Sequence, residues 1–124
     1  MLHLLGDKSR IWLAIVAHIS ATVAMLWPSP DLPDIDVPMV DKWAHFLVFG
    51  VLYYLWASAL QNRGHILGLT LKLVFALFFY GIIVEVIQEY WYVSRTGDLM
   101  DVLANTIGIL LGLTAINVKE KLYR

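Results

Sequence analysis

The chain has 124 residues, of which 60% are hydrophobic and 15% charged, and its mean hydropathy is +0.70. A soluble domain of this size buries too small a fraction of its surface to hide so much apolar area, so the composition excludes an ordinary small soluble protein. The net charge of −1 and the lack of a basic stripe give no reason to expect nucleic acid as a partner. Cysteine is absent from the sequence, which excludes disulfides and cysteine-ligated zinc.

Four apolar segments predict four transmembrane helices, because a helix crosses a bilayer with about 20 apolar residues and at least roughly 17. The segments are 11–27, 43–60, 69–92 and 99–117. Each is apolar around most of its circumference, as in a helix packed in lipid, and none shows the alternation of a membrane β-strand. The predicted fold is therefore all-α: one membrane domain over residues 1–124, formed by a bundle of four transmembrane helices.

The first apolar segment has a competing interpretation. Lys8 and Arg10 precede it, and Thr22-Val23-Ala24 could serve a signal peptidase, as in a cleaved signal peptide. We favour a spanning helix, because cleavage would leave three spans and separate the basic residues from one another. The loop that follows, 28–42, contains all four prolines and four aspartates, and prolines discourage helix there.

The basic residues predict the orientation, because short cytoplasmic loops are enriched in lysine and arginine. Seven of the nine basic residues fall at one set of segment ends: Lys8, Arg10, Arg63, Lys72, Lys119, Lys121 and Arg124. Only Lys42 and Arg95 fall at the other. We therefore expect an inner (cytoplasmic) membrane protein with both termini cytoplasmic and the opposite end extracytoplasmic. Four aromatic residues should then lie near the outer interface: Trp27, Trp43, Trp91 and Tyr92.

Polar side chains collect at the outer ends of three segments. They are Asp41, Lys42 and His45 in the second segment, Glu85, Gln88 and Glu89 in the third, and Asp98, Asp101 and Asn105 in the fourth. Spacings of three and four residues place side chains on one face of a helix. An ionisable residue at mid-membrane costs about 2.5–3.5 kcal/mol and usually faces the protein interior or a cavity. The sequence thus predicts one polar cluster, built from three helices, at the extracytoplasmic end.

A functional site in this cluster would use its members differently. We assign catalytic roles to His45, Glu85 and Asp41, with Asp41 orienting the imidazole that follows it by one helical turn. Arg95 is the natural clamp for an anion, since its planar guanidinium offers paired donors. The expected substrate-binding residues are Lys42, Gln88, Arg95, Asp98, Asp101 and Asn105.

Structural roles compete with these assignments. Glu85 could pair with Lys42, His45 or Arg95 and fix helix packing, and Asp98 could cap the fourth helix. Carboxylates of the cluster with the histidine could also bind a divalent cation, although no spacing demands a metal and we assign no cofactor.

Other residues predict packing. His18, in the middle of the first segment, is expected to form a hydrogen bond between helices. Ala104, Gly108 and Gly112 form a strip of small residues along which another helix can approach closely. The partner of this strip is either the third helix or a second copy of the chain, so a homo-oligomer through these residues is one expectation.

The ordered polar positions resemble the VanZ-like family of small polytopic membrane proteins. They are Asp41-Lys42-x-x-His45-Phe46, Glu85-x-x-Gln88 and Arg95-x-x-Asp98-x-x-Asp101-x-x-x-Asn105-x-x-Gly108. The resemblance covers residues 41–112. The founding member of this family is linked to resistance against the glycopeptide antibiotic teicoplanin, so the resemblance implies a role in the cell envelope. It implies no particular reaction.

Two functions follow as hypotheses. In the first, the polar site binds a membrane lipid or a lipid-linked envelope precursor and contributes to glycopeptide tolerance, and whether chemistry follows binding is left open. In the second, the protein is a non-enzymatic helper that alters envelope assembly through a protein partner. Transport ranks last, because four helices without internal repeats offer little for alternating access.

Overall fold

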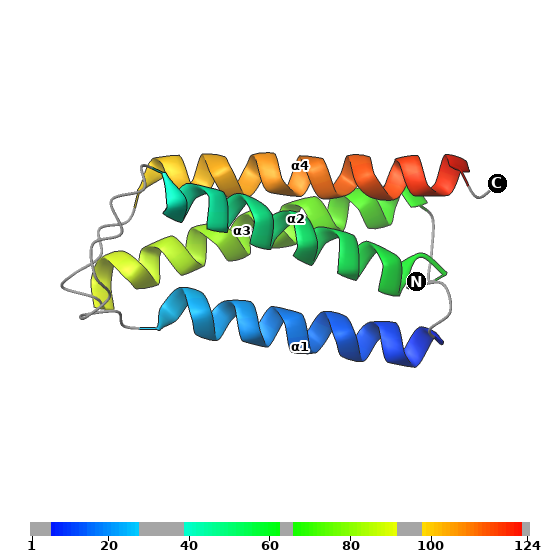
Figure 1. Cartoon of the computed structure of the whole chain (residues 1–124), viewed down its shortest axis with the longest axis horizontal. Coiled ribbons are helices and arrows are strands. Elements are labelled where there is room, and N and C mark those ends of the chain that lie inside the picture. Colours follow the sequence, from blue (N-terminus) through cyan, green and yellow to red (C-terminus); the bar gives the residue numbers. More distant parts are fainter. Residues whose placement is uncertain (1–5, 28–38, 63–65, 92–97, 123–124) are drawn as a thin grey trace.

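The computed structural model describes residues 6–27, 39–62, 66–91 and 98–122, and helices account for nearly all of them. The helices are α1 (Asp7–Leu26), α2 (Val40–Leu60), α3 (Ile66–Trp91) and α4 (Leu99–Leu122) (Figure 1). No strand occurs in these described ranges. The prediction of an all-helical membrane fold is confirmed, since each helix is long and apolar enough to cross a bilayer.

The helices extend beyond the apolar segments at several ends. α1 begins at Asp7 rather than at position 11, and α4 continues to Leu122 rather than ending at 117. Asp7 lies in the first turn of α1, and Lys119 and Lys121 lie in the last turn of α4. Charges of these signs interact favourably with the helix dipole, so the helices continue into the polar region outside the apolar span.

Successive helices run in opposite directions, so α2 and α4 are parallel and α1 and α3 run the other way (Figure 1). The closest packing is between α2 and α4, and α1 lies on the other side of the bundle against α2 and α3. The core centres on Phe49, Leu52 and Tyr53 of α2, which pack with Val84 of α3 and Ile109 of α4. α2 is therefore the central helix and α1 the most peripheral one.

Glycines explain why α2 and α4 approach so closely. A Cβ atom on Gly108 would lie 2.2 Å from the carbonyl oxygen of Phe46, and one on Gly112 would lie 2.5 Å from that of Gly50. Only glycine leaves room for backbone at these distances. The small-residue strip thus meets α2 of the same chain, which is neither of the two partners expected from sequence. Gly108 and Gly112 are buried by this contact, and Ala104 is half-buried.

Three exposed tryptophans lie together at one end of the bundle, while a fourth, Trp12, is exposed near the start of α1. Trp27 follows the end of α1, Trp43 lies in the first turn of α2 and Trp91 is the last residue of α3, and all three are exposed. Tyr92, expected in the same group, lies outside the described residues. This arrangement is typical of an aromatic belt at a membrane interface. That this interface is the outer one stays a prediction.

Candidate functional site

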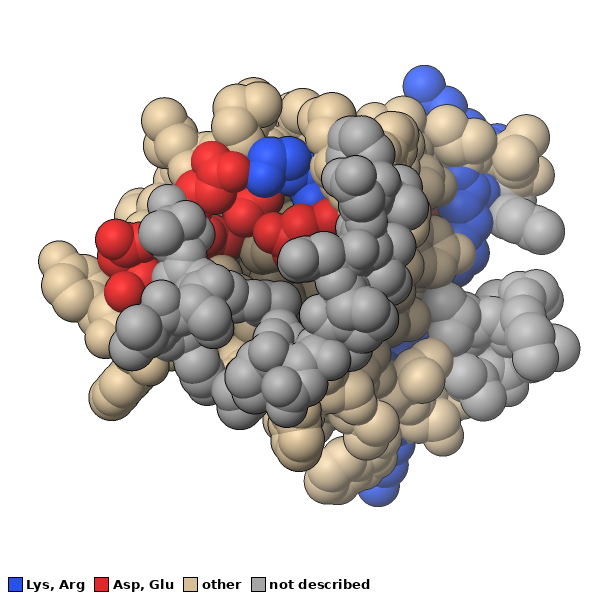
Figure 2. Space-filling view, turned by 60° about the vertical axis from the view of Figure 1, so that its left-hand side comes forward, with Lys and Arg blue, Asp and Glu red and all other residues tan. Residues whose placement is uncertain are grey.

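The candidate site lies at the bundle end where α2 begins, α3 ends and α4 begins (Figure 1). Figure 2, turned toward this end, shows acidic groups gathered around a basic one. Contacts between side chains bring together most of the residues selected from sequence. We call the following set the polar cluster: Asp41, Lys42, His45, Glu85, Asp98, Asp101 and Asn105.

Lys42 connects α2 to the start of α4. Its Nζ donates to Asp98 Oδ2 at 2.7 Å and to Asp101 Oδ1 at 3.1 Å. Asp98 remains partly exposed, whereas the Asp101 side chain is buried. Both aspartates therefore engage the only lysine among the members of the cluster.

His45 is buried, with 4% of its surface exposed, and its Nδ1 lies 3.0 Å from Asn105 Oδ1. An amide oxygen only accepts, so Nδ1 carries the proton in this contact and the lone pair of neutral His45 is on Nε2. Asp41 Oδ1 lies 3.9 Å from Nε2, which is too long for a hydrogen bond. In the structure Asn105 orients the imidazole, through a contact between helices, and the orienting role assigned to Asp41 stays a prediction.

Glu85 is buried, with 6% of its surface exposed. Its Oε2 accepts a hydrogen bond from the backbone N–H of Asp98 at 3.3 Å. Its Oε1 lies 3.6 Å from Nδ1 of His45 and has no hydrogen-bond partner within the described parts of the chain. Of the pairings weighed from sequence, Glu85 faces His45, while Lys42 bonds two other carboxylates.

Asp98 caps α4, as the structural interpretation expected. Its Oδ1 accepts from the backbone N–H of Met100 at 2.8 Å, which satisfies a donor at the start of the helix. The hydrogen bond from Lys42, followed by the one from Met100, holds the pKa of Asp98 below its usual value. Asp98 therefore combines a capping role with an ion pair.

Two substrate-binding residues predicted from sequence are not part of the polar cluster. Gln88 is buried, and its amide nitrogen donates to the carbonyl oxygen of Met25 at 2.8 Å, near the end of α1. This bond joins α3 to α1 and serves a carbonyl that the helix end leaves without an intrahelical partner. Arg95, the predicted anion clamp, lies outside the described residues.

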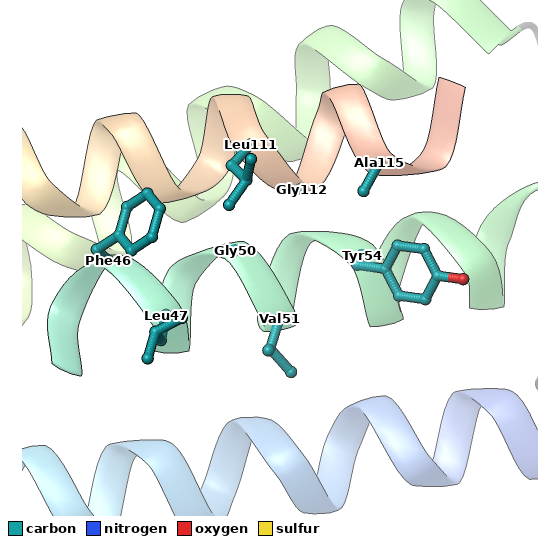
Figure 3. A pocket seen from close by; sticks show the side chains of 8 residues that line it. All are labelled: Phe46, Leu47, Gly50, Val51, Tyr54, Leu111, Gly112 and Ala115. Atoms are coloured by element: carbon teal, nitrogen blue, oxygen red, sulfur yellow. The ribbon is translucent and has the colours of Figure 1, made fainter. Parts of the chain in front are cut away.

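A groove between α3 and α4 opens beside the polar cluster and has a volume of about 260 Å³. Glu85 and Asp98 line it together with apolar side chains of both helices. A second groove, between α2 and α4, has a volume of about 300 Å³ and lies over the glycine contact (Figure 3). Its lining carries no charged residue: Phe46, Leu47, Gly50, Val51, Tyr54, Leu111, Gly112 and Ala115. Of these two grooves, the α3–α4 groove is the one that joins charged and apolar groups.

The comparisons with known proteins give one match. A family model described as VanZ/LLP1 matches residues 5–120. The chain belongs to the VanZ/LLP1 family. No curated protein and no solved structure matches the chain.

The VanZ/LLP1 match confirms the resemblance inferred from residues 41–112 and also covers α1. In α1, Nδ1 of His18 accepts a hydrogen bond from Trp56 of α2 at 3.2 Å. The predicted bond between helices is therefore present. Thr22 and Tyr80 share a further hydrogen bond of 2.7 Å between α1 and α3.

Arg10 is a buried polar residue that the sequence analysis used only for orientation. It pairs with Asp7, donates to the carbonyl oxygen of Ser58 at 3.2 Å, and lies at the bundle end opposite the polar cluster. The only available signal was its position at the edge of an apolar segment, which is where membrane-interface arginines are common.

Three groups of the polar cluster could hold a metal ion. Asp41, His45 and Asp101 each offer a ligand atom, and these atoms lie within 4.8 Å of one another. Carboxylate oxygens with one imidazole nitrogen are ligands suited to divalent transition ions.

Proposed function

We propose that this VanZ/LLP1 membrane protein binds an amphiphilic envelope molecule, with its headgroup at the polar cluster and a hydrocarbon chain in the α3–α4 groove. The observation that carries this proposal is the lining of that groove. Three acidic residues line this groove together with apolar side chains: Glu85, Glu89 and Asp98 with Ile82, Val86 and Leu99. A molecule with a polar head and an apolar tail matches such a surface.

The charges of the cluster indicate which headgroups suit it. Four carboxylates face one lysine and one histidine among the described residues, and the lysine already serves Asp98 and Asp101. Carboxylates accept hydrogen bonds, so a head rich in hydroxyl, amide or ammonium donors is favoured. The sugars and peptide of a lipid-linked cell-wall precursor have this chemistry.

The position of the groove supports lateral entry from the membrane. Val86, Tyr90 and Leu99 line the groove and are exposed, so a lipid chain can reach it without entering the bundle core. The exposed tryptophans at the same end are typical of a membrane interface, which is where a lipid headgroup lies. We place this end at the extracytoplasmic face of the cytoplasmic membrane, on the distribution of basic residues.

Photo-crosslinking tests the proposal. A benzophenone amino acid at Val102, in the α3–α4 groove, is compared with one at Val118, which is exposed elsewhere on the same helix. The probe is a polyprenyl-linked sugar phosphate with a radiolabelled sugar, in nanodiscs. We expect several-fold more labelling at Val102, reduced by Glu85→Gln because a headgroup acceptor is weakened. Glu120→Gln, at the other end of α4, serves as the matched control.

Equal labelling at both sites, or labelling that Glu85→Gln leaves unchanged in a folded variant, would remove the proposal. Cross-links only to another protein would instead favour the non-enzymatic helper. The family resemblance motivates a cellular readout with the same variants. If the site contributes to glycopeptide tolerance, Glu85→Gln lowers the teicoplanin concentration that stops growth, and Glu120→Gln does not.

A further inference from the structure

We infer that the polar cluster binds a divalent transition-metal ion through Asp41, His45 and Asp101. Asp41 and His45 come from the first two turns of α2 and Asp101 from the first turn of α4, and their ligand atoms lie within 4.8 Å of one another. Ligands of one ion at about 2.1 Å lie up to roughly 4.2 Å apart. Asp41 Oδ1 already lies 3.9 Å from His45 Nε2, and its side chain is 59% exposed and therefore free to adjust.

The hydrogen bonding of His45 leaves its Nε2 available for coordination, and Asp41 Oδ1 lies 3.9 Å from this nitrogen. Both groups near its Nδ1 are oxygen acceptors: Asn105 Oδ1 at 3.0 Å and Glu85 Oε1 at 3.6 Å. The proton of a neutral imidazole therefore belongs on Nδ1, which leaves Nε2 free to coordinate. Metal-binding histidines usually donate their other ring N–H to an oxygen in this way.

The unpaired oxygen of Glu85 is a second, independent indication. Glu85 Oε1 is buried, lies 3.6 Å from Nδ1 of His45 and has no hydrogen-bond partner among the residues that the structure describes. A carboxyl oxygen placed beside Nδ1 can accept from the ring N–H that is not used for coordination, as in many histidine metal sites. The described cluster has four carboxylates against one lysine, so a divalent ion would remove most of the excess negative charge.

The ligand chemistry narrows the choice of ion. Two carboxylates and one imidazole suit Mn²⁺, Fe²⁺ or Zn²⁺ better than Ca²⁺, which prefers oxygen ligands alone. With three protein ligands, the ion keeps open positions for water or for an oxygen of a headgroup. A cation would thus let this acidic site accept a phosphate oxygen, a role that rests on the function proposed above.

Binding of the metal alone tests the inference. The full chain is purified in detergent, stripped with chelator and titrated with Mn²⁺, and the signal of free Mn²⁺ is followed by electron paramagnetic resonance. We expect saturable binding of one ion and a nitrogen modulation from the imidazole in pulsed spectra. Asp41→Asn and His45→Gln should weaken binding at least tenfold, since even changes to residues that orient a ligand cost about 10–100-fold.

Asp98→Asn is the matched control. It removes the same charge from the same cluster, and Asp98 is not one of the three proposed ligands; Lys42 keeps its bond to Asp101 in this variant. Asparagine also retains the capping ability of the position. We expect binding of Mn²⁺ by this variant to stay within about threefold, a factor that corresponds to less than 1 kcal/mol.

Three results would overturn the inference. They are no saturable binding by the folded wild type, bound Mn²⁺ without nitrogen modulation, or equal weakening in Asp98→Asn and Asp41→Asn. The last would show only general attraction of cations to an acidic surface. Asp41 is exposed, so its variant should fold, and helix content checks each protein. The lipid cross-linking experiment is also repeated in the presence of chelator. Because no metal is bound there, its result tests the proposed lipid binding separately from the metal site.

Discussion

At the residue scale, Lys42 shows how one side chain can hold two helices in register. Its ammonium group lies between Asp98 and Asp101, which are separated by one turn at the start of α4. The contact is only partly buried, so it combines electrostatic attraction with direct hydrogen bonds. It fixes the polar ends of α2 and α4, while the glycines fix their apolar middles.

The pH dependence of stability follows from Asp98. Its lowered pKa means that the ion pair stabilises the folded state fully above the ordinary aspartate pKa of about 3.9 and that this stabilisation is lost as the pH falls through the lowered value. We therefore expect wild type to exceed Asp98→Asn in stability at pH 7, with the difference shrinking below about pH 4. Thermal unfolding in detergent with chelator, followed by circular dichroism, measures both curves.

A difference between these curves that stayed constant from pH 7 to pH 3 would contradict this prediction. Glu120→Gln provides the control, because it removes a carboxylate from the opposite end of α4. The stability difference between wild type and Glu120→Gln should not show the loss below about pH 4 that we expect for Asp98→Asn, because Glu120 is not part of the Lys42–Asp98 ion pair.

At the element scale, α2 and α4 pack too closely to accommodate one additional side-chain atom at Gly108. The atoms that a Cβ on Gly108 would meet belong to the backbone of Phe46, and backbone cannot rotate away as a side chain can. α1 packs differently: its described core residues are few, and hydrogen bonds of His18, Thr22 and Met25 join it to α2 and α3 beside its apolar contacts. We expect the α2–α4 pair to be the most rigid part of the bundle.

Gly108→Ala tests this rigidity. The added methyl group should force the two helices apart and cost at least about 2 kcal/mol, as in other overpacked contacts. Gly68→Ala is the matched control, because no atom lies within 4 Å of a Cβ placed there. Alanine is the better helix former, so the control should be neutral or stabilising by up to about 1 kcal/mol. Unfolding by titration with denaturing detergent compares the two, and equal stability would refute the close contact.

At the scale of the whole molecule, the bundle has two different ends. One carries the polar cluster and the exposed tryptophans, and the other carries Arg10 with Asp7 and the lysines of the last turn of α4. The excess of basic residues at the second end predicts that it is cytoplasmic. The polar cluster would then lie just beneath the external surface of the membrane.

Cysteine labelling tests this orientation cleanly, because the sequence contains no cysteine. Ser9→Cys and Leu122→Cys place a thiol at one end, and Met39→Cys places one at the other; all three positions are exposed. We expect a membrane-impermeant maleimide to label Met39→Cys in intact spheroplasts and the other two only after permeabilisation. The reverse pattern would put the polar cluster on the cytoplasmic side and remove the extracytoplasmic site.

The sequence alone was sufficient for the class of protein, the number of helices and the family. These depend on local properties: the length of an apolar run, its periodicity, and the order of polar residues along the chain. It also indicated that His45, Glu85 and Asp101 would gather, because ionisable groups in a membrane avoid lipid.

Only the tertiary structure decided which groups pair. Asn105 orients His45, Gln88 bonds to α1, and Gly108 packs on α2. Each of these contacts joins residues far apart in the chain. Such pairing depends on the rotation and depth of whole helices, which the packing of all their side chains sets together. Helical spacing specifies the face on which a residue lies, and the arrangement of the bundle specifies what that face meets.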